Sequence, residues 1–180
     1  MLVEIKKIDA VVVDRLFAVY AESMEDLAAD FGSADDMRAD YEGFLREFIR
    51  KPGQLILVEA DGDDWVSALR AIEYRPSVWF MEAVETAPDR RGQGFGRRLL
   101  NHSVERLLSL GAQRIECIIH PDNTASQCLH ASCGFVPTDD KPVNCWGETE
   151  TGCILWRYSH GGTGKEQKKE SNWRFVEVTR

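Results

Sequence analysis

The sequence has no long hydrophobic run, and no apolar segment approaches the length of about 20 residues that a membrane-spanning helix needs. The first residues become charged at Glu4 and Lys6, which is not typical of a signal peptide. These two features predict a protein that has no membrane partner and is not secreted.

Paired cysteines are also missing. The five cysteines are Cys117, Cys128, Cys133, Cys145 and Cys153, and no two of them form a C-x-x-C motif. An odd number of cysteines without paired spacing is typical of reduced thiols, and the absence of paired ligands argues against a zinc site. We therefore expect a cytoplasmic protein without a metal centre.

The sequence has no excess of positive charge. It has 22 Lys and Arg against 30 Asp and Glu, which gives a net charge of −8. Nucleic-acid binding needs clustered basic side chains, so we expect no nucleic-acid partner. Nine acidic residues lie between Glu22 and Glu47, opposed only by Arg38 and Arg46. They form either a solvated outer face or an acidic rim that attracts an amine cation.

Two common phosphate-binding motifs are absent. A G-x-G-x-x-G fingerprint starting at Gly92 would need a glycine where Arg97 stands, and one starting at Gly94 would need a glycine in place of Leu99. The P-loop also fails, because Gly164-Lys165 is followed by Glu166 instead of Ser or Thr. These mismatches argue against a dinucleotide-dependent oxidoreductase and against a P-loop kinase.

A glycine-rich turn is present instead. The apolar run Val78–Val84 is followed by Gly92, Gly94 and Gly96, and then by an amphipathic helix. Alternating glycines let backbone amides approach a ligand closely, and the start of a helix adds partial positive charge. Full charges nearby come from Arg90, Arg91, Arg97 and Arg98. The pattern predicts a diphosphate site, and the alternative is a tight turn whose arginines are only solvated.

Hydrophobic periodicity predicts the other elements of the chain. The expected strands are Leu2–Ile8, Gln54–Ala60, Trp65–Tyr74, Val78–Thr86, Arg114–His120, Gly134–Val136 and Cys153–Tyr158. The expected helices cover Val13–Leu27, Met37–Phe48, a segment ending near Leu110, and a short segment from Thr124 to Ser132. The apolar stripes of the first two helices are expected to be core. This order predicts an α/β fold with a mixed, mostly antiparallel sheet and helices on both faces.

The C-terminal segment differs in composition. Residues 159–171 are rich in Gly and Lys, which is typical of a linker, and Trp173–Val178 alternates like a strand. We therefore expect one domain over residues 1–158 and a linker with a strand-like extension over residues 159–180. An isolated strand needs a sheet edge, so a homodimer is one expectation.

Two motifs together carry a family resemblance. Arg91-x-x-Gly94-x-Gly96 is followed by Asn123, a short helix and Gly134-Phe135, in the order and spacing of the GNAT-type (GCN5-related) N-acetyltransferases. The chain resembles this family closely over Val78–Val136. The resemblance implies the GNAT acyltransferase fold and acetyl-CoA as cosubstrate. It also implies transfer of the acetyl group to a primary amine of a small molecule or peptide, by direct attack in a ternary complex.

The resemblance also implies a cofactor site. Backbone groups at the end of the fourth strand would hold the pantetheine arm and the thioester carbonyl, the glycine turn would hold the pyrophosphate, and an Asn would meet the cofactor arm. The implied cofactor-binding residues are Val84, Glu85, Thr86, Arg91, Gly92, Gln93, Gly94, Phe95, Gly96, Arg97 and Asn123.

The general acid is where the sequence departs from the family pattern. Family members commonly have a tyrosine seven residues after the Asn, and its hydroxyl protonates the departing thiolate, but here the residue is His130. An imidazole can perform the same proton transfer. The alternative is that His130 only packs locally and the thiolate leaves unaided or with water.

A carboxylate is the expected general base, because the attacking amine must first lose a proton. Glu82 and Glu85 are the candidates on the fourth strand, and Glu73 on the preceding strand is a third. A separation of three places Glu82 and Glu85 on opposite faces of a regular strand unless a bulge intervenes. A covalent route through Cys128 or Cys133 is less favoured, because no histidine-activated cysteine is evident.

The uncertain acid and base leave a second function open, namely a non-catalytic acyl-CoA-binding or regulatory domain of the same fold. The acceptor site is expected between the N-terminal helices and the segment Asp139–Thr151, where no motif identifies the amine. The acidic residues of that segment hint at a cationic substrate.

Overall fold

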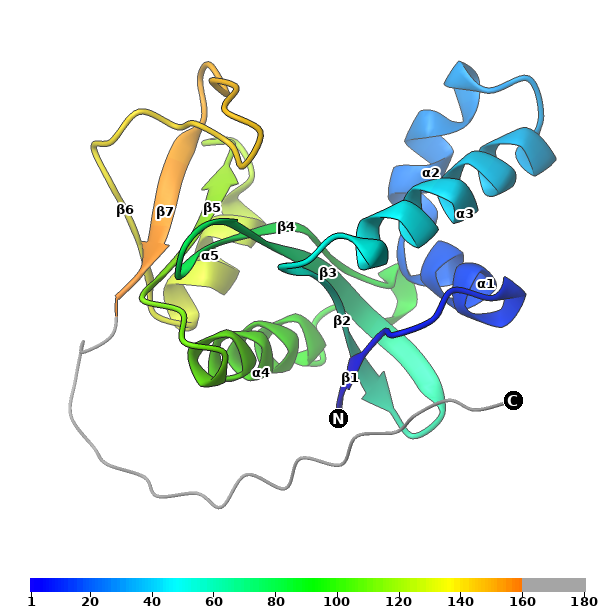
Figure 1. The fold of residues 1–180 in the computed structure, drawn as a ribbon, viewed down its shortest axis with the longest axis horizontal. Coiled ribbons are helices and arrows are strands. Elements are labelled where there is room, and N and C mark those ends of the chain that lie inside the picture. The colour runs from blue at the N-terminus through cyan, green and yellow to red at the C-terminus, as the bar shows by residue number, and fades with distance from the viewer. Residues whose placement is uncertain (160–180) are drawn as a thin grey trace.

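A seven-stranded sheet forms the centre of the computed structural model, which describes residues 1–159 (Figure 1). The strands follow the order β1-β2-β3-β4-β5-β7-β6, and the pairing of β4 with β5 is parallel while the other pairs are antiparallel. Their bounds are β1 Leu2–Glu4, β2 Gln54–Asp61, β3 Asp64–Arg75, β4 Val78–Thr86, β5 Arg114–Ile119, β6 Phe135–Pro137 and β7 Ile154–Tyr158.

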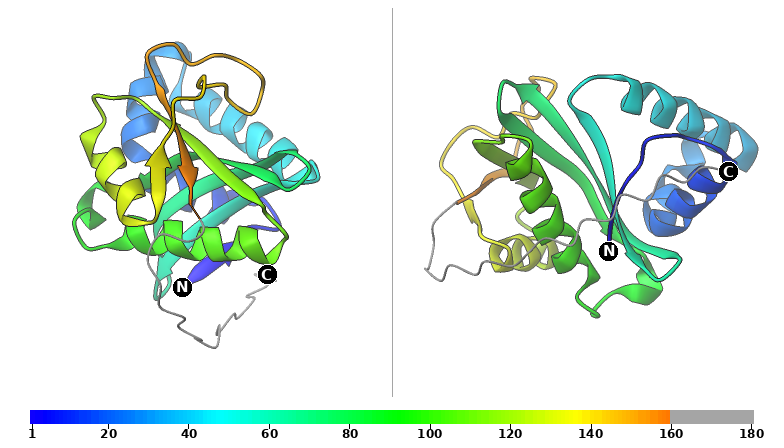
Figure 2. Two further views of the ribbon diagram at one scale, coloured as in Figure 1. Left: turned by 90° about the vertical axis from the view of Figure 1, so that its left-hand side faces the viewer. Right: turned by 60° about the horizontal axis from the view of Figure 1, so that its bottom comes forward.

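Helices cover both faces of this sheet (Figure 2). Helices α1 to α3 pack on one face, and α4 and α5 pack on the other. Their bounds are α1 Ala10–Val19, α2 Ala21–Leu27, α3 Ala34–Arg50, α4 Phe95–Ser109 and α5 Thr124–Ser132, with short 3-10 turns at Ala28–Asp30 and Pro88–Arg90. The predicted mixed, mostly antiparallel sheet with helices on both faces is confirmed.

Alternation along the strands produces two hydrophobic cores. In β2, Ile56 and Val58 pack among the residues of α1 to α3, whereas Leu57 between them packs against α4. Successive side chains of a strand point to opposite faces, so a strand that is covered on both sides is apolar throughout. The glycine turn connects β4 to α4 on one face of the sheet. Helices α1 to α3 lie on the other face.

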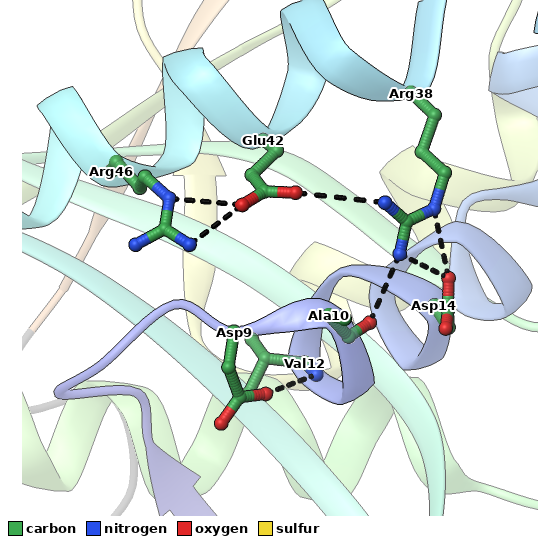
Figure 3. A network of polar contacts seen from close by, with 7 residues as sticks. All are labelled: Asp9, Ala10, Val12, Asp14, Arg38, Glu42 and Arg46. Atoms are coloured by element: carbon green, nitrogen blue, oxygen red, sulfur yellow. Dashed lines mark hydrogen bonds and ion pairs between the residues drawn. The ribbon is translucent and has the colours of Figure 1, made fainter. Parts of the chain in front are cut away.

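Polar contacts hold α1 and α3 together (Figure 3). The Asp9 carboxylate caps α1 by accepting from the Val12 amide at 3.0 Å. Arg38 of α3 donates to Asp14 at 2.7 Å and also pairs with Glu42 on its own helix. Exposed pairs of this kind add little stability. They link the surfaces of α1 and α3.

The N-terminal elements differ from the prediction. The first strand ends at Glu4 instead of Ile8, although Ile5 and Ile8 are buried in the core with α1 to α3. The single helix expected over Val13–Leu27 breaks at Tyr20, which adopts a non-helical conformation between α1 and α2. Periodicity missed this break, because buried side chains continue on both sides of it.

Two further observations concern the extent of the chain. The predicted linker after Ser159 and the predicted strand Trp173–Val178 lie outside the described residues. Among residues 1–159, no helix has the length and apolarity to cross a membrane.

Candidate active site

Strands β4 and β5 separate along their length. They pair only over Val78–Phe80 and Arg114–Glu116, although β4 continues to Thr86 and β5 to Ile119. Figure 1 shows the two strands diverging beyond this short contact. The last part of β4 therefore lacks a β5 partner, and its backbone on that side is open to a ligand.

A cleft of about 790 Å³ lies between this end of β4, the glycine turn, α5 and α2. It is lined by ten of the predicted cofactor-binding residues, namely Val84, Glu85, Thr86, Arg91, Gly92, Gly94, Phe95, Gly96, Arg97 and Asn123. Gln93 is the exception, because its side-chain amide donates to the Asp89 carbonyl oxygen at 3.2 Å. Gln93 stabilises the turn instead of lining the cleft.

The glycines of the turn have two different tasks. Gly92 and Gly94 have φ angles of 74° and 81°, in the left-handed region that favours glycine. Gly96 is needed for close approach, since a Cβ atom there would lie 3.1 Å from Thr86 Oγ1 and 3.3 Å from Leu129 Cδ2. The first two glycines shape the turn, and the third lets the start of α4 pack against β4 and α5.

The turn presents free backbone donors. Helix α4 begins at Phe95, and its N-cap Gly94 has no side chain to cap it. Within residues 1–159, the amides of residues 92–97 have no hydrogen-bond partner. Unpaired amides at a helix start form an anion site, and the side chains of Arg91 and Arg97 line the same cleft. The residues present therefore fit a diphosphate.

Not every nearby arginine contributes. Arg98 was expected to add charge beside the turn, but its guanidinium lies 4.2 Å from the centre of the Phe95 ring and 3.6 Å from Glu59 Oε1. Arg98 does not line the cleft. Arg90 lines it and is held by Asp64 at 2.7 Å.

A β-bulge in β4 sets the direction of the two candidate bases. Glu85 pairs with Ala68 and Glu82 pairs with Arg70, which leaves two residues of β4 opposite one of β3. Ala83 inside the bulge has a φ of 49°. The bulge reverses the alternation, so Glu82 and Glu85 both lie on the face that α1 to α3 cover. A regular strand would have separated them.

Two hydroxyl groups hold the bulge in place. Tyr20 donates to the Ala83 carbonyl oxygen at 2.9 Å, and Ser67 donates to the Glu85 carbonyl oxygen at 2.6 Å. Strained backbone persists only where its surroundings enforce it, and such strain is concentrated at functional sites. The break between α1 and α2 at Tyr20 thus has a structural consequence at the end of β4.

The candidate bases differ in their contacts. Glu82 Oε1 accepts from Arg70 Nε at 2.7 Å in a mostly buried ion pair, and Glu82 does not line the cleft. Glu85 lines the cleft, and its Oε2 accepts from Ser23 at 2.6 Å. Its Oε1 is buried without a hydrogen-bond partner, 3.7 Å from an Arg91 nitrogen. The third candidate, Glu73, accepts from the Ser77 amide in a turn.

His130 does not line the cleft. It is 2% exposed, and its ring packs edge-on against Phe135. Its Nδ1 lies 2.8 Å from the Ser126 carbonyl oxygen, which only accepts, so Nδ1 carries the proton of the neutral ring. Nε2 is buried without a partner, and burial lowers the pKa of His130. The role of proton donor remains a prediction, and these contacts do not favour it.

The burial of His130 predicts acid sensitivity. The unfolded chain protonates this histidine near its ordinary pKa of about 6.5, whereas the folded state resists protonation until a lower pH. The contribution of the neutral His130 ring to the free energy of unfolding is therefore fully present above about pH 6.5. It is lost as the pH falls toward the pKa of His130 in the folded state. We expect Tm to fall less steeply with decreasing pH below neutrality in His130→Gln than in the wild type. Thermal unfolding at a series of pH values measures the two slopes.

The matched control for this measurement is His120→Gln, which removes an exposed imidazole. Equal slopes of Tm against pH in the wild type and in His130→Gln would contradict the interpretation of His130 as a buried neutral ring.

The sequence did not reveal several lining residues. Helix α2 contributes Glu22, Ser23 and Asp26, and α5 contributes Ala125, Ser126, Cys128, Leu129 and Ser132. The family resemblance placed α5 beside the cofactor without identifying its inner face. No motif marked α2. Cys128 is the exposed cysteine of this set, while Cys133 is buried with its pKa raised by burial.

A second pocket of about 460 Å³ adjoins the cleft and shares Ser23, Val84 and Glu85 with it. It lies between α2, α3 and the bulge of β4. Its other lining residues are Tyr20, Met24, Leu27, Phe31, Met37, Asp40, Tyr41, Phe44, Arg70 and Ala83. Periodicity assigned the apolar stripes of α2 and α3 to the core, but part of each stripe lines this pocket.

The sheet that opens at β4 and the anion site beside it define a coenzyme A-dependent acyltransferase. Comparison with known families gives the same result, because residues 20–135 match the Acetyltransferase (GNAT) family. The chain therefore belongs to this family, and acetyl-CoA is its cosubstrate. No curated protein sequence matches the chain significantly.

Solved structures share the fold at low sequence identity. The PaiA N-acetyltransferase of Thermoplasma acidophilum, in complex with coenzyme A, is similar with a TM-score of 0.66 and 14% identity, covering 89% of this chain and 99% of that one. A spermidine N-acetyltransferase SpeG chimera from Vibrio cholerae and hSSAT is similar with a TM-score of 0.64 and 15% identity, covering 87% of this chain and 94% of that one. The ribosomal-protein-alanine N-acetyltransferase of Brucella melitensis is similar with a TM-score of 0.62 and 20% identity, covering 87% of this chain and 98% of that one.

Proposed function

We propose that the protein is an acetyl-CoA-dependent N-acetyltransferase that acts on a primary amine by direct attack in a ternary complex. One observation carries the proposal: the cleft and the second pocket meet at Ser23, Val84 and Glu85. Two substrates that occupy separate cavities come together at these residues. Direct transfer requires this arrangement, because it has no covalent enzyme intermediate.

Different residues of the cleft bind different parts of acetyl-CoA. The amides of residues 92–97 and the side chains of Arg91 and Arg97 hold the diphosphate. The open backbone of Val84–Thr86 holds the arm. Asn123 lines the cleft and caps α5, since its side-chain oxygen accepts from the Ser126 amide at 3.0 Å. When bound, acetyl-CoA supplies the acyl group as an activated thioester.

Glu85 acts as the general base. Its Oε2 is fixed by Ser23, and its buried Oε1 is available to accept a proton from the ammonium of the substrate. Glu82 is less available, because Arg70 Nε lies 2.7 Å from its Oε1, whereas the Arg91 nitrogen lies 3.7 Å from Glu85 Oε1. Since His130 does not line the cleft, we propose that water protonates the departing thiolate.

Initial-rate measurements test the order of events. Release of the coenzyme A thiol should be followed while the concentrations of acetyl-CoA and the amine are both varied. Direct attack predicts double-reciprocal lines that intersect, and Cys128→Ser should leave the rates unchanged. Parallel lines, together with loss of activity in Cys128→Ser, would replace the ternary complex with an acyl-cysteine route.

The second candidate function is a non-catalytic acyl-CoA-binding domain. The position of His130 outside the cleft favours it, because the side chain in the family's acid position is buried and does not line the cleft. The two functions differ in turnover. Calorimetric binding of coenzyme A without thiol release on any primary amine would select the binding domain.

A further inference from the structure

We infer that the second pocket selects a primary monoamine with a single apolar substituent, bound with its ammonium at Glu85. This inference rests on the proposed function, since it assigns the acceptor of the same site. It draws on the apolar lining of the pocket, on two buried polar atoms within it that lack a hydrogen bond, and on the buried ion pair between Arg70 and Glu82.

Much of the wall of the pocket consists of hydrocarbon and aromatic rings. Helix α2 contributes Met24 and Leu27, α3 contributes Met37 and Phe44, and Phe31 comes from the loop between them. A wall of this kind gains free energy by burying apolar surface and offers no hydrogen bonds to a polar chain. The body of the substrate that fits it is therefore apolar.

Two buried polar atoms of the lining lack a hydrogen bond, although one of them, Glu85 Oε1, lies 3.7 Å from an Arg91 nitrogen. Glu85 Oε1 and the Tyr41 hydroxyl have no hydrogen bond within the part of the chain described. Glu85 and Tyr41 both line the pocket, and burial raises the pKa of Tyr41 to about 12. Buried groups of this kind need partners. An ammonium supplies several N–H donors and satisfies both acceptors.

Apart from Glu85, the described lining of the pocket holds no buried carboxylate for a second cation. Arg70 lines the pocket, and its guanidinium lies 4.9 Å from the centre of the Phe44 ring. Glu82 neutralises this guanidinium, so a second ammonium would meet the apolar wall without a partner of opposite charge. The other carboxylate of the lining, Asp40, is exposed at the rim. The pocket therefore disfavours polyamines and accepts one ammonium.

Competing amines test this selection in the full-length protein. Thiol release from acetyl-CoA should be measured with 2-phenylethylamine, ethylamine and spermidine. Burying a phenyl group contributes about 1.5–3 kcal/mol, so kcat/KM for 2-phenylethylamine should exceed that for ethylamine by roughly 10- to 100-fold. We expect an advantage of at least about tenfold over spermidine, which carries charge into the apolar wall.

A pair of matched variants locates the effect in the pocket. Leu27 lines the pocket and is 46% exposed, so Leu27→Trp adds bulk at the rim of the pocket without overpacking the core. Its KM for 2-phenylethylamine should rise about tenfold, while the KM values for ethylamine and acetyl-CoA stay unchanged. Leu110→Trp is the control, because Leu110 is 43% exposed and lines neither cavity.

The outcomes separate the inference from the proposed function. Turnover of spermidine that equals or exceeds that of 2-phenylethylamine overturns the inference and leaves the acetyltransferase assignment intact. Equal effects of Leu27→Trp and Leu110→Trp also overturn it. Absence of thiol release with every amine removes the proposed function, and the inference falls with it.

Discussion

Replacement of Glu85 with glutamine is expected to lower kcat/KM for the amine by roughly 100- to 10,000-fold, while the affinity for coenzyme A is unchanged. Glutamine keeps the shape of the side chain and an oxygen that can accept the Ser23 hydrogen bond, but it cannot take a proton. Steady-state thiol release and calorimetry with coenzyme A measure the two quantities separately.

A pH profile distinguishes general-base catalysis from a structural effect. The Glu85→Gln variant should recover activity as the pH rises, because the free amine then forms in solution and needs no base. Glu82→Gln is the matched control. It breaks the ion pair with Arg70, so it should lower stability more than it lowers the rate. Full activity in Glu85→Gln near neutral pH would contradict the assignment of Glu85.

Gly94→Leu is expected to reduce coenzyme A affinity by at least about 100-fold. A residue other than glycine at a φ of 81° costs about 1–2 kcal/mol, and the same change tilts the amides that follow. The new side chain also projects from a residue that lines the cleft, into space bounded only by Arg97 at 4.0 Å. Calorimetric titration with coenzyme A measures the loss.

Backbone strain alone can be isolated at the other end of α4. Gly111 has a φ of 90°, has open space around it and lies outside the cleft. Gly111→Leu should lower Tm without changing coenzyme A affinity. If both glycine variants lose affinity equally, the diphosphate site is not at the turn.

The strand, turn and helix around the glycines could be predicted because their signals are local. Gly92, Gly94 and Gly96 mark the turn, and the apolar run before them and the amphipathic pattern after them have different periods. Ten of the cofactor-binding residues that the family resemblance implied line the cleft. Their roles in binding remain predictions.

The bulge at Ala83 could not be predicted, because alanine gives no backbone signal. It is maintained by Tyr20 and Ser67, which are distant in sequence, and it decides that Glu82 and Glu85 share a face. In a regular strand, their separation of three residues would place Glu82 and Glu85 on opposite faces. Register at such a site depends on tertiary contacts.

Periodicity also cannot distinguish a packed core from the wall of a cavity. Met37, Tyr41 and Phe44 recur at helical spacing whether they face other side chains or an open pocket. His130 shows a related limit. Its position after Asn123 matches the family pattern, but the direction of its ring follows from the hydrogen bond to Ser126, four residues earlier on the same helix.

The most direct test of the account measures both products of one reaction. The full-length protein is incubated with acetyl-CoA and a panel of primary amines, and mass spectrometry quantifies the acetylated amine while a thiol reagent quantifies free coenzyme A. The account predicts equal amounts of the two products in the wild type and almost none of either in Glu85→Gln. Free thiol without acetylated amine, or bound coenzyme A without any product, would contradict it.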